Sequence, residues 1–514
     1  MSKQHLLGVD IGTTGSKGVV VTPEGRVVAY QFREHGVATP RPGWCEQDAD
    51  AVWWADLAHI IRGLLETSGL EPAAIGGVGI SGTCPNMLPV DDEGRPLCPG
   101  MLYSDGRAVQ EIAEINDRIG EERIFQGLGR RLGPDSVGAK LLWLRKHEPE
   151  VFSRTRMVHT ATSYLVFRLT GAQVIDVTSA FGISPLYSPA RMDWDAEICG
   201  ELGLPTTMFP RPRWSYEVAG RVTAEASRQT GLAVGTPVVV GACDAPAEAI
   251  STGAVSPGEA SLLYGTTMIM GLILDPPAAG QRSLGWPMIA PGLYRAPLIM
   301  STSGALTRWF RDNLGQMEKE AESQLGINAY SLLSEQAAEV PPGAEGLLAL
   351  PYFSGERSPI FDPRARGLIL GLTLSHTRKH VYRALLEGTA FGLQHGLEGF
   401  RQAGAQVTRI VATGGGTKSR VWTQIVSDVI GRDQEILKAP YGAPYGDAYL
   451  AGMGIGLFTD VTGLRDLWRQ ETSLVRWDPQ RHEVYGRYFA IYRGLYETLK
   501  DDMHALAELS AARA

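Results

Sequence analysis

The chain has 514 residues, a length that exceeds one ordinary hydrophobic core and favours two large domains. Its composition, 44% hydrophobic and 20% charged residues, is typical of a globular protein. The formal net charge is −8 and no long run of Lys and Arg occurs, so a nucleic-acid partner is not expected. The cysteines are scattered without CxxC spacing, which argues against a disulfide framework and a zinc cluster.

The start of the chain predicts where the protein resides. It runs from Met1 into an apolar strand pattern within a few residues, so we expect no signal peptide. The apolar segment 261–274 is interrupted by Gly265-Thr-Thr267 and is too short to span a bilayer. We therefore expect a cytoplasmic protein without a membrane partner.

The N-terminal half opens with a predicted β-meander. Short apolar runs at 6–10, 18–22 and 26–30 are separated by turn residues, which is typical of consecutive strands. Asp48 is a suitable N-cap for a helix, because apolar residues then recur at three-to-four spacing from Trp53 to Leu65. Strands and helices continue to alternate, which predicts an α/β fold.

The second half repeats part of this layout. Strands are expected at 260–264 and 268–274 around Gly265-Thr-Thr267, as around Gly12-Thr-Thr14, and this weak repeat favours two related domains. Helices are expected at 378–402 and 420–431, followed by a C-terminal helix with an aromatic stripe. We expect that stripe to cover its own lobe, with a homodimer as the alternative. The turn-rich stretch after residue 250 predicts domains 1–250 and 251–514.

The first motif is Asp10-Ile-Gly-Thr-Thr-Gly-Ser-Lys17. A glycine-rich turn between strands offers converging backbone N–H groups to a polyphosphate, and Thr13, Thr14 and Ser16 add hydroxyls. Asp10 can hold a water of Mg²⁺ close to the phosphates. A simple hairpin turn accounts for the same residue types. The loop is not a Walker A motif, because G-x-x-x-x-G-K-[ST] is absent from the chain.

Asp244 follows the apolar run 237–241, where α/β folds usually place their chemistry. A sugar hydroxyl that attacks a γ-phosphate needs a carboxylate to orient it and accept its proton. The alternative is a turn aspartate that caps the helix beginning near Pro246.

Two further turns predict close approach of a ligand to the backbone. Gly265-Thr-Thr267 repeats the phosphate-binding logic of the first turn. Thr413-Gly-Gly-Gly-Thr-Lys-Ser419 joins a strand to a helix, and its glycines let a flat ring or a phosphate reach the backbone. A tight turn without a ligand would look similar.

Other functional signatures are weak. Gly77-Val-Gly-Ile-Ser-Gly82 satisfies G-x-G-x-x-G, but the prolines after it leave no helix, so a dinucleotide site is not expected. His147, His380 and His395 are expected in helices and have no metal-ligand spacing. No G-x-S-x-G elbow supports a serine hydrolase.

The ordered set Asp10-x-Gly-Thr-Thr, Gly241-x-x-Asp244, Gly265-Thr-Thr267 and Gly414-Gly-Gly416 resembles the FGGY carbohydrate kinase family. The resemblance runs over roughly residues 5 to 460 and includes Pro351-Tyr-Phe-Ser-Gly-Glu-Arg-Ser-Pro359. It implies two ribonuclease-H-like lobes of the actin/hexokinase type around a central cleft. The N-terminal lobe would bind the sugar, and the C-terminal lobe would bind the nucleotide.

The resemblance also implies roles for individual residues. Asp244 would be the catalytic base, and Asp10 with Asp244 would hold Mg²⁺ through water. The ATP-binding candidates are Gly12, Thr13, Thr14, Ser16, Lys17, Gly265, Thr266, Thr267, Gly304, Gly414, Gly415, Gly416 and Ser419. The sugar-binding candidates are Thr83, Cys84, Pro85, Asn86, Tyr103, Asp105 and Asp244.

Within the family the chain resembles the xylulokinases, which predicts phosphorylation of D-xylulose to D-xylulose 5-phosphate. Two departures bear on the sugar. Thr83-Cys-Pro-Asn86 replaces a Gln-Met-His-Gly-like stretch, and Tyr103-Ser-Asp-Gly-Arg107 replaces a Trp-x-Asp-x-Arg pattern. Because a site built for a particular hydroxyl discriminates strongly, these changes leave ribulose, glycerol and deoxy sugars open as substrates. A non-catalytic nucleotide-dependent sensor and a Rossmann dehydrogenase are the alternatives from other classes.

Overall fold

The structure is a computed structural model that describes residues 5–277 and 285–511. The chain forms two compact units. Unit 1 comprises Met1–Val255, Asp275–Arg295 and Tyr441–Arg469, and unit 2 comprises Ser256–Leu274, Ala296–Pro440 and Gln470–Ala514. The chain therefore enters each unit more than once. The expectation about a leader rests partly on residues 1–4, which lie outside the described residues.

Unit 1 is built on a mixed sheet with the strand order β13-β14-β5-β1-β2-β3, in which β15 also pairs with β5. As predicted, β1, β2 and β3 form a meander, and β1 is antiparallel to β2 but parallel to β5. The strands are β1 (His5–Ile11), β2 (Gly15–Val21), β3 (Val27–Glu34), β5 (Ile75–Gly82), β13 (Val218–Arg221), β14 (Pro237–Val239) and β15 (Ala242–Cys243).

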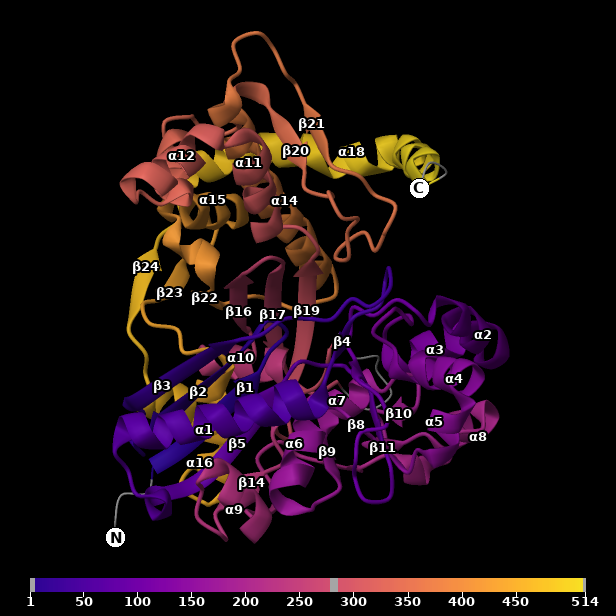
Figure 1. Cartoon of the computed structure of the whole chain (residues 1–514). Helices are drawn as coiled ribbons and strands as arrows, with labels where there is room; N and C mark the ends of the chain where they lie inside the picture. Colours follow the sequence, from indigo (N-terminus) through magenta and orange to yellow (C-terminus); the bar gives the residue numbers. More distant parts are fainter. Residues whose placement is uncertain (1–4, 278–284, 512–514) are drawn as a thin grey trace. The chain divides into compact units, whose positions relative to one another are not determined.

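Helices cover both faces of this sheet (Figure 1). On one face, α1 (Ala55–Ser68) and the π-helical turn before it (Ala49–Trp54) contribute to a fully buried apolar cluster, and Asp48 is the N-cap, as predicted. On the other face, α16 (Ala443–Gly454) lies so close that a Cβ on Gly8 or Gly79 would be 1.9 Å or 2.0 Å from its backbone oxygens. Glycine is therefore required there because the sheet and the helix backbone touch.

The remaining elements of unit 1 surround that sheet. Its other helices include α6, α7 and α10, and a second apolar cluster forms around α2, α4 and α8. These helices are α2 (Val109–Ile119), α3 (Glu121–Leu128), α4 (Val137–His147), α5 (Pro149–Arg154), α6 (Ala161–Thr170), α7 (Val177–Gly182), α8 (Ala196–Leu202), α9 (Ala224–Thr230), α10 (Asp244–Ser251) and α17 (Gly463–Leu467). Short strands are β4 (Glu46–Gln47), β6 (Leu88–Val90), β7 (Gly100–Met101), β8 (Met157–His159), β9 (Val174–Asp176), β10 (Tyr187–Ser188), β11 (Asp193–Trp194), β12 (Arg211–Arg213) and β18 (Trp286–Pro287).

Unit 2 repeats the strand pattern of unit 1. The sheet runs in the order β18-β19-β17-β16-β22-β23-β24, of which β18 and the first two residues of β19 belong to unit 1. β16 is antiparallel to β17 but parallel to β22, as β1 is to β2 and β5. The strands other than β18 are β16 (Glu259–Tyr264), β17 (Met268–Leu274), β19 (Tyr294–Met300), β22 (Arg409–Thr413), β23 (Gln434–Leu437) and β24 (Thr472–Val475). The weak repeat in the sequence therefore reflects two units of related topology.

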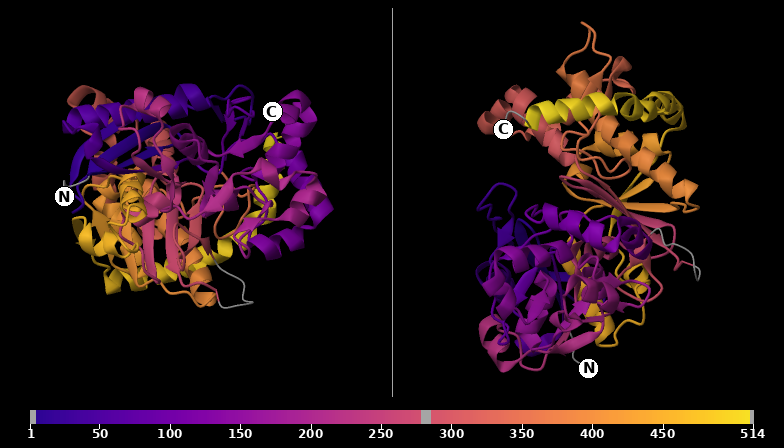
Figure 2. Two further views of the ribbon diagram at one scale, coloured as in Figure 1. Left: turned by 90° about the horizontal axis from the view of Figure 1, so that it is seen from below. Right: turned by 90° about the vertical axis from the view of Figure 1, so that its right-hand side faces the viewer.

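The helices of unit 2 bury one continuous apolar cluster against this sheet. The predicted helices at 378–402 and 420–431 are confirmed as α14 (Arg378–Gln402) and α15 (Arg420–Ile430). The aromatic stripe of α18 (Pro479–Ala511) packs on this cluster, and α18 is one continuous helix (Figure 2). The other elements are α11 (Gly304–Leu314), α12 (Gln316–Leu325), α13 (Ala329–Ala338), β20 (Leu348–Leu350) and β21 (Leu368–Leu370). Among the described residues, no helix has the length and apolar character to cross a bilayer.

Candidate functional site

Polar side chains converge on the face of the unit 1 sheet that α16 covers. Asp10 on β1 lies opposite Lys17 on β2 and opposite Ser81 on β5. Directly paired residues project from the same face of a sheet, so the three side chains are neighbours. The same alternation puts Leu7, Val9 and Ile11 in the apolar cluster with α1.

Two helices complete this group. Ser81 Oγ lies 2.6 Å from Asp447 Oδ2 on α16 and 3.1 Å from Asp10 Oδ1, so the two carboxyl groups share its one hydroxyl proton. Lys17 Nζ lies 3.5 Å from Asp10 Oδ2 and 3.9 Å from Glu248 Oε2 on α10. Together with Asp244 these residues form what we call the Asp10 cluster: Asp10, Lys17, Ser81, Asp244, Glu248 and Asp447.

Asp244 is the first residue of α10 and reaches the cluster through an unusual backbone. Gly241 before it has φ +83°, and a Cβ there would lie 2.3 Å from the Ile80 carbonyl oxygen. This close approach lets β15 pair with the end of β5, next to Ser81 and Gly82. The half-buried Asp244 accepts a hydrogen bond from the Ala245 amide at 2.8 Å and one from Cys243 Sγ at 3.3 Å. Since the helix begins at Asp244 itself, this carboxylate is not the N-cap that the alternative required.

The electrostatics of the cluster set the protonation of Asp244. Burial, followed by the neighbouring charge of Asp10, raises the pKa of Asp244 to about 7. Burial likewise raises the pKa of Glu248 and that of Asp447. For Lys17, burial opposes the charged form, but the Asp10 and Glu248 carboxylates raise its pKa. The result is a carboxylate whose pKa lies near the pH at which a general base works best.

The donor set of the cluster suits a magnesium ion bound mainly through water. Asp447 Oδ1 is buried and has no hydrogen-bond partner, and several carboxyl groups share one lysine. In the described part of the chain, no three His, Cys, Asp or Glu side chains are arranged to enclose a metal ion. Mg²⁺ in kinase sites uses one or two carboxylates, several waters and the substrate phosphates, so the residues present fit this ion.

Neighbouring residues of the first motif point to different faces of the sheet. Lys17 belongs to the Asp10 cluster, whereas Ser16 is fully buried and donates to Asp56 Oδ2 at 2.7 Å. Thr13 is half-buried and its hydroxyl lies 3.3 Å from that of Thr83, while Thr14 is exposed. Gly12 closes the turn through its amide, which donates to the Gly15 carbonyl at 3.1 Å. The side chain of Ser16 therefore lies outside the Asp10 cluster, to which Lys17 belongs.

The loop 83–86 is attached to the same end of β5. Asn86 is fully buried, donates to the Thr83 carbonyl at 2.6 Å and accepts from the Ala161 amide at 2.8 Å. Its side chain therefore braces the loop. Cys84 and Pro85 are half-buried, and Cys84 Sγ donates to Ser179 Oγ at 3.4 Å.

Asp105 is fully buried in an ion pair. Arg107 donates to it through Nε at 2.8 Å and through Nη2 at 2.6 Å, and the Cys45 amide adds a bond of 2.7 Å. Burial works against the charged form, but these donors hold the pKa of Asp105 below its ordinary value. The carboxylate therefore fixes the fold around the half-buried Tyr103.

The nucleotide-binding candidates of unit 2 meet at the end of β16. The Gly304 amide donates to the Gly265 carbonyl at 2.9 Å, and the Ala305 amide donates to that of Thr266 at 3.0 Å. A Cβ on Gly304 would lie 2.4 Å from the Gly265 oxygen, so only glycine permits this contact. On the other side, Gly414 has φ +100°, and its Cβ would lie 2.7 Å from the Tyr264 oxygen.

The glycines after β22 differ in the space above their backbone. A Cβ on Gly415 would meet no atom within 4 Å, whereas Gly416 lies against the ring of Trp422. Ser419 is the N-cap of α15, because its hydroxyl accepts from the Trp422 amide at 3.3 Å. Gly415 is therefore the open position of this glycine-rich turn, which contacts Tyr264 at the end of β16.

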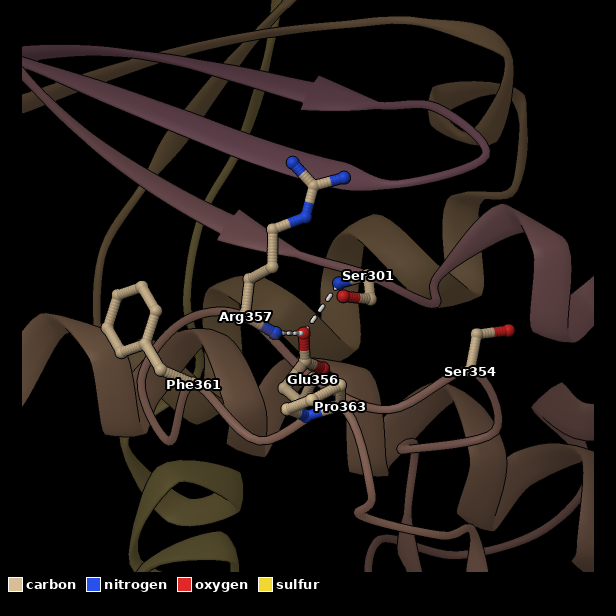
Figure 3. Close-up of a pocket in the computed structure, with 6 residues that line it drawn as sticks. All are labelled: Ser301, Ser354, Glu356, Arg357, Phe361 and Pro363. Atoms are coloured by element: carbon tan, nitrogen blue, oxygen red, sulfur yellow. Dashed lines mark hydrogen bonds between the residues drawn. The ribbon is translucent and has the colours of Figure 1, made fainter. Parts of the chain in front are cut away.

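A cavity of about 420 Å³ opens beside the segment that leads into α11. Figure 3 shows Glu356 at its base, where the carboxylate accepts from the Ser301 amide at 2.6 Å and from the Arg357 amide at 2.8 Å. Burial raises the pKa of Glu356 to about 7. Ser354, Phe361 and Pro363 complete the lining. Glu356 thus anchors the strand end from which Gly304 reaches the Gly265 turn.

Sequence reasoning missed three members of the Asp10 cluster and one neighbouring cation. Ser81 lies in the G-x-G-x-x-G stretch that predicts no dinucleotide site, Glu248 and Asp447 lie outside the motifs, and only long-range contacts bring the three to the cluster. A carboxylate within the otherwise buried, apolar α16 was the available signal for Asp447. Arg295 gave no signal in the sequence.

Comparisons with known proteins identify the family of the chain. Residues 5–251 match the N-terminal domain of the FGGY family of carbohydrate kinases, and residues 260–455 match its C-terminal domain. The xylulose kinase of Bacillus subtilis (strain 168) is 27% identical over 97% of this chain and 98% of its own length. The gluconokinase of the same organism is 28% identical over 83% of this chain and 82% of its own length.

A solved structure of xylulose kinase from Rhodospirillum rubrum superposes with a TM-score of 0.89 at 33% identity, covering 98% of this chain and 100% of that one. This similarity confirms the predicted fold class of two α/β lobes of the actin/hexokinase type. The protein is therefore a carbohydrate kinase, and the chain belongs to the FGGY family.

Proposed function

We propose that the protein transfers the γ-phosphoryl group of ATP to a primary hydroxyl of a ketose, with D-xylulose to D-xylulose 5-phosphate as the leading reaction. The observation that carries this proposal is Asp244, a half-buried carboxyl group at a strand end whose pKa is raised to about 7. The relatives named xylulose kinase support the choice of sugar.

Asp244 acts as the general base. Its carboxylate orients the attacking hydroxyl and accepts its proton as the bond to phosphorus forms. Phosphoryl transfer depends on positioning and charge stabilisation, so the base must be held rigidly. The hydrogen bond from the Ala245 amide and the pairing of β15 with β5 provide this rigidity.

The rest of the Asp10 cluster serves the phosphates. Asp10 and Asp244 would hold Mg²⁺ through water, and Asp447 Oδ1, which has no hydrogen-bond partner, would be a further acceptor. The ion, when bound, neutralises charge on the phosphate oxygens. Lys17 stays protonated beside Asp10 and adds a positive charge to the same group.

Unit 2 supplies the nucleotide site. The glycines at 265, 304 and 414–416 keep the backbone free of side-chain bulk, and at Gly415 no atom lies within 4 Å of an added Cβ. A phosphate or a flat ring can therefore approach the backbone closely here.

The sugar site is proposed on unit 1 beside loop 83–86 and Tyr103. The side chains of Asn86 and Asp105 are hydrogen-bonded to other residues of the chain. The candidates for contact with the sugar are therefore the half-buried residues Cys84, Pro85 and Tyr103. This differs from a loop that offers a histidine to the sugar. A cytoplasmic location and a homodimer remain predictions.

A coupled assay of ADP release tests the proposal directly. The panel includes D-xylulose, ribulose, glycerol, gluconate and a deoxy sugar, because relatives named gluconokinase and glycerol kinase are about as similar as those named xylulose kinase. We expect the highest kcat/KM with D-xylulose. If the protein bound ATP and a sugar but released ADP with none of the panel, the result would favour a non-catalytic sensor instead.

A further inference from the structure

Arg295 is a buried cation whose side chain has no hydrogen-bond or ion-pair partner among the residues that the structure describes. It lies at the start of β19 within unit 1 and is 5% exposed. Its Nε is enclosed and makes no hydrogen bond, and among the described residues its guanidinium has no ion-pair partner. Buried charged groups are normally paired, because removing a lone cation from water is costly. Such a group in a fold is therefore expected to meet a partner that binds later.

The neighbours of Arg295 lead to the proposed sugar site. Arg295 pairs in register with Trp286 on β18, and Trp286 stacks on Phe181 of α7 with ring centroids 4.9 Å apart. The Thr178 hydroxyl, also on α7, donates to the Pro287 carbonyl at 3.4 Å. These contacts tie the Arg295 hairpin to α7.

The same short helix holds the other parts of that site. Ser179 of α7 accepts from Cys84, and a Cβ on Gly182 would lie 2.6 Å from Pro85. β15, which ends at Cys243, also contacts α7. Loop 83–86, the residues before the base and the Arg295 hairpin therefore surround one helix.

Electrostatics agree with this placement. Burial lowers the pKa of Arg295 to about 10, and the acidic groups of Cys243 and Asp244 are near enough to oppose this shift. The guanidinium nevertheless remains charged at neutral pH. It therefore places a permanent positive charge within electrostatic range of Asp244.

We propose that Arg295 binds the carbonyl oxygen of the ketose and thereby selects ketoses over the corresponding polyols. This inference rests on the proposed function. A guanidinium has only donors, and a carbonyl oxygen has only acceptor sites, so the two match without an unsatisfied proton. A secondary alcohol at the same carbon brings a hydroxyl proton that a donor-only partner cannot accept. The buried charge makes this difference large, because unmatched polar groups are costly there.

The test compares a ketose with the polyol that differs from it only at the carbonyl carbon, for example D-xylulose and xylitol. The measured quantity is kcat/KM for the ketose divided by kcat/KM for the polyol in the ADP-release assay. It is measured for the unaltered full chain and for Arg295→Met. Loss of a hydrogen bond to a charged group lowers the ratio by roughly ten- to a hundredfold. Arg228→Gln, an exposed arginine on α9 of the same unit, leaves the ratio unchanged.

Each outcome separates the two levels of the proposal. An equal loss for both sugars, or no change in the ratio, would overturn the role of Arg295 while leaving the kinase intact. Failure of the unaltered protein to release ADP with either sugar, or with any other of the panel, would overturn the proposed function itself.

The thermal midpoint of unfolding gives a second readout. Removal of an unpaired buried charge is expected to raise the midpoint of Arg295→Met without ligand. A lowered midpoint would assign Arg295 to the fold and contradict the inference. Arg295→Lys keeps the charge but not the planar fork, and is expected to recover only part of the sugar selectivity.

Discussion

The two Gly-Thr-Thr turns have the same sequence but different surroundings. The turn at 12–14 is preceded by Asp10 and followed by Lys17, and both belong to a cluster of ionisable side chains. The turn at 265–267 follows the apolar Leu263 and is held by backbone amides of 303–305. The two turns therefore share their topology, but ionisable side chains flank the first and backbone hydrogen bonds hold the second. This difference suggests chemistry in unit 1 and nucleotide binding in unit 2.

Asp244→Asn tests the first half of this comparison and should have the largest effect. Asparagine keeps the shape and the hydrogen bond from the Ala245 amide but cannot accept the proton. We expect kcat to fall by on the order of 10²–10⁴, the range for loss of a general base, with ATP affinity nearly unchanged. Steady-state kinetics and calorimetric titration with ATP measure the two quantities.

Near-full turnover by Asp244→Asn would remove Asp244 from the role of base. The suitable control is Asp193→Asn, an exposed carboxylate of the same unit, which should leave both quantities unchanged.

Gly304→Ala tests the second half. The added Cβ would lie 2.4 Å from the Gly265 oxygen, so the turn at 265–267 must move. A displacement of this kind is expected to raise the KM for ATP by roughly ten- to a hundredfold, because misplaced donors bind phosphate poorly. The KM for the sugar should change little.

Gly399→Ala is the matched control, since a Cβ on that helical glycine meets no atom within 4 Å. It should leave the KM for ATP unchanged and raise stability by about 0.5–1 kcal/mol. If Gly304→Ala instead raised only the KM for the sugar, the division of roles between the units would be wrong.

Much of this arrangement was predictable from local sequence patterns. The meander at the start of the chain, the strand pair around 265–267 and the bounds of α14 follow from periodicity and turn residues. The turns themselves could be located because glycine and threonine have specific backbone preferences.

The rest depends on long-range contacts that no local pattern encodes. Asp447 belongs to a segment that returns to unit 1 after most of unit 2. Arg295 ends a short unit 1 segment that lies in sequence between two segments of unit 2. The Ser16 hydroxyl is expected at the phosphates from its place in the first motif, and Asn86 is expected at the sugar from the resemblance. The structure turns both inward, and which way a polar side chain faces depends on packing partners that are distant in sequence.

Ser16→Ala sharpens the comparison between the two faces of the first hairpin and should have the smallest effect on turnover. The Ser16 hydroxyl donates to Asp56, whose carboxylate also lies 2.7 Å from His35 Nδ1 and 3.1 Å from Arg33 Nε. Loss of this bond is expected to lower the free energy of unfolding by about 1–2 kcal/mol. The kcat should stay within about a factor of 3, a small change on the scale of lost catalytic groups.

Denaturant unfolding and steady-state kinetics distinguish the two roles of Ser16. A tenfold loss of kcat at unchanged stability would place its hydroxyl at the phosphates after all.

The pH dependence of kcat/KM tests the central claim most directly. A base whose pKa is raised to about 7 is protonated, and therefore inactive, below that pH. We predict that kcat/KM for the sugar rises about tenfold per pH unit below 7 and levels off above it, and that Asp244→Asn loses this dependence. A profile that is flat between about pH 5 and 8, or the same slope in Asp244→Asn, would contradict the assignment of Asp244 as the base.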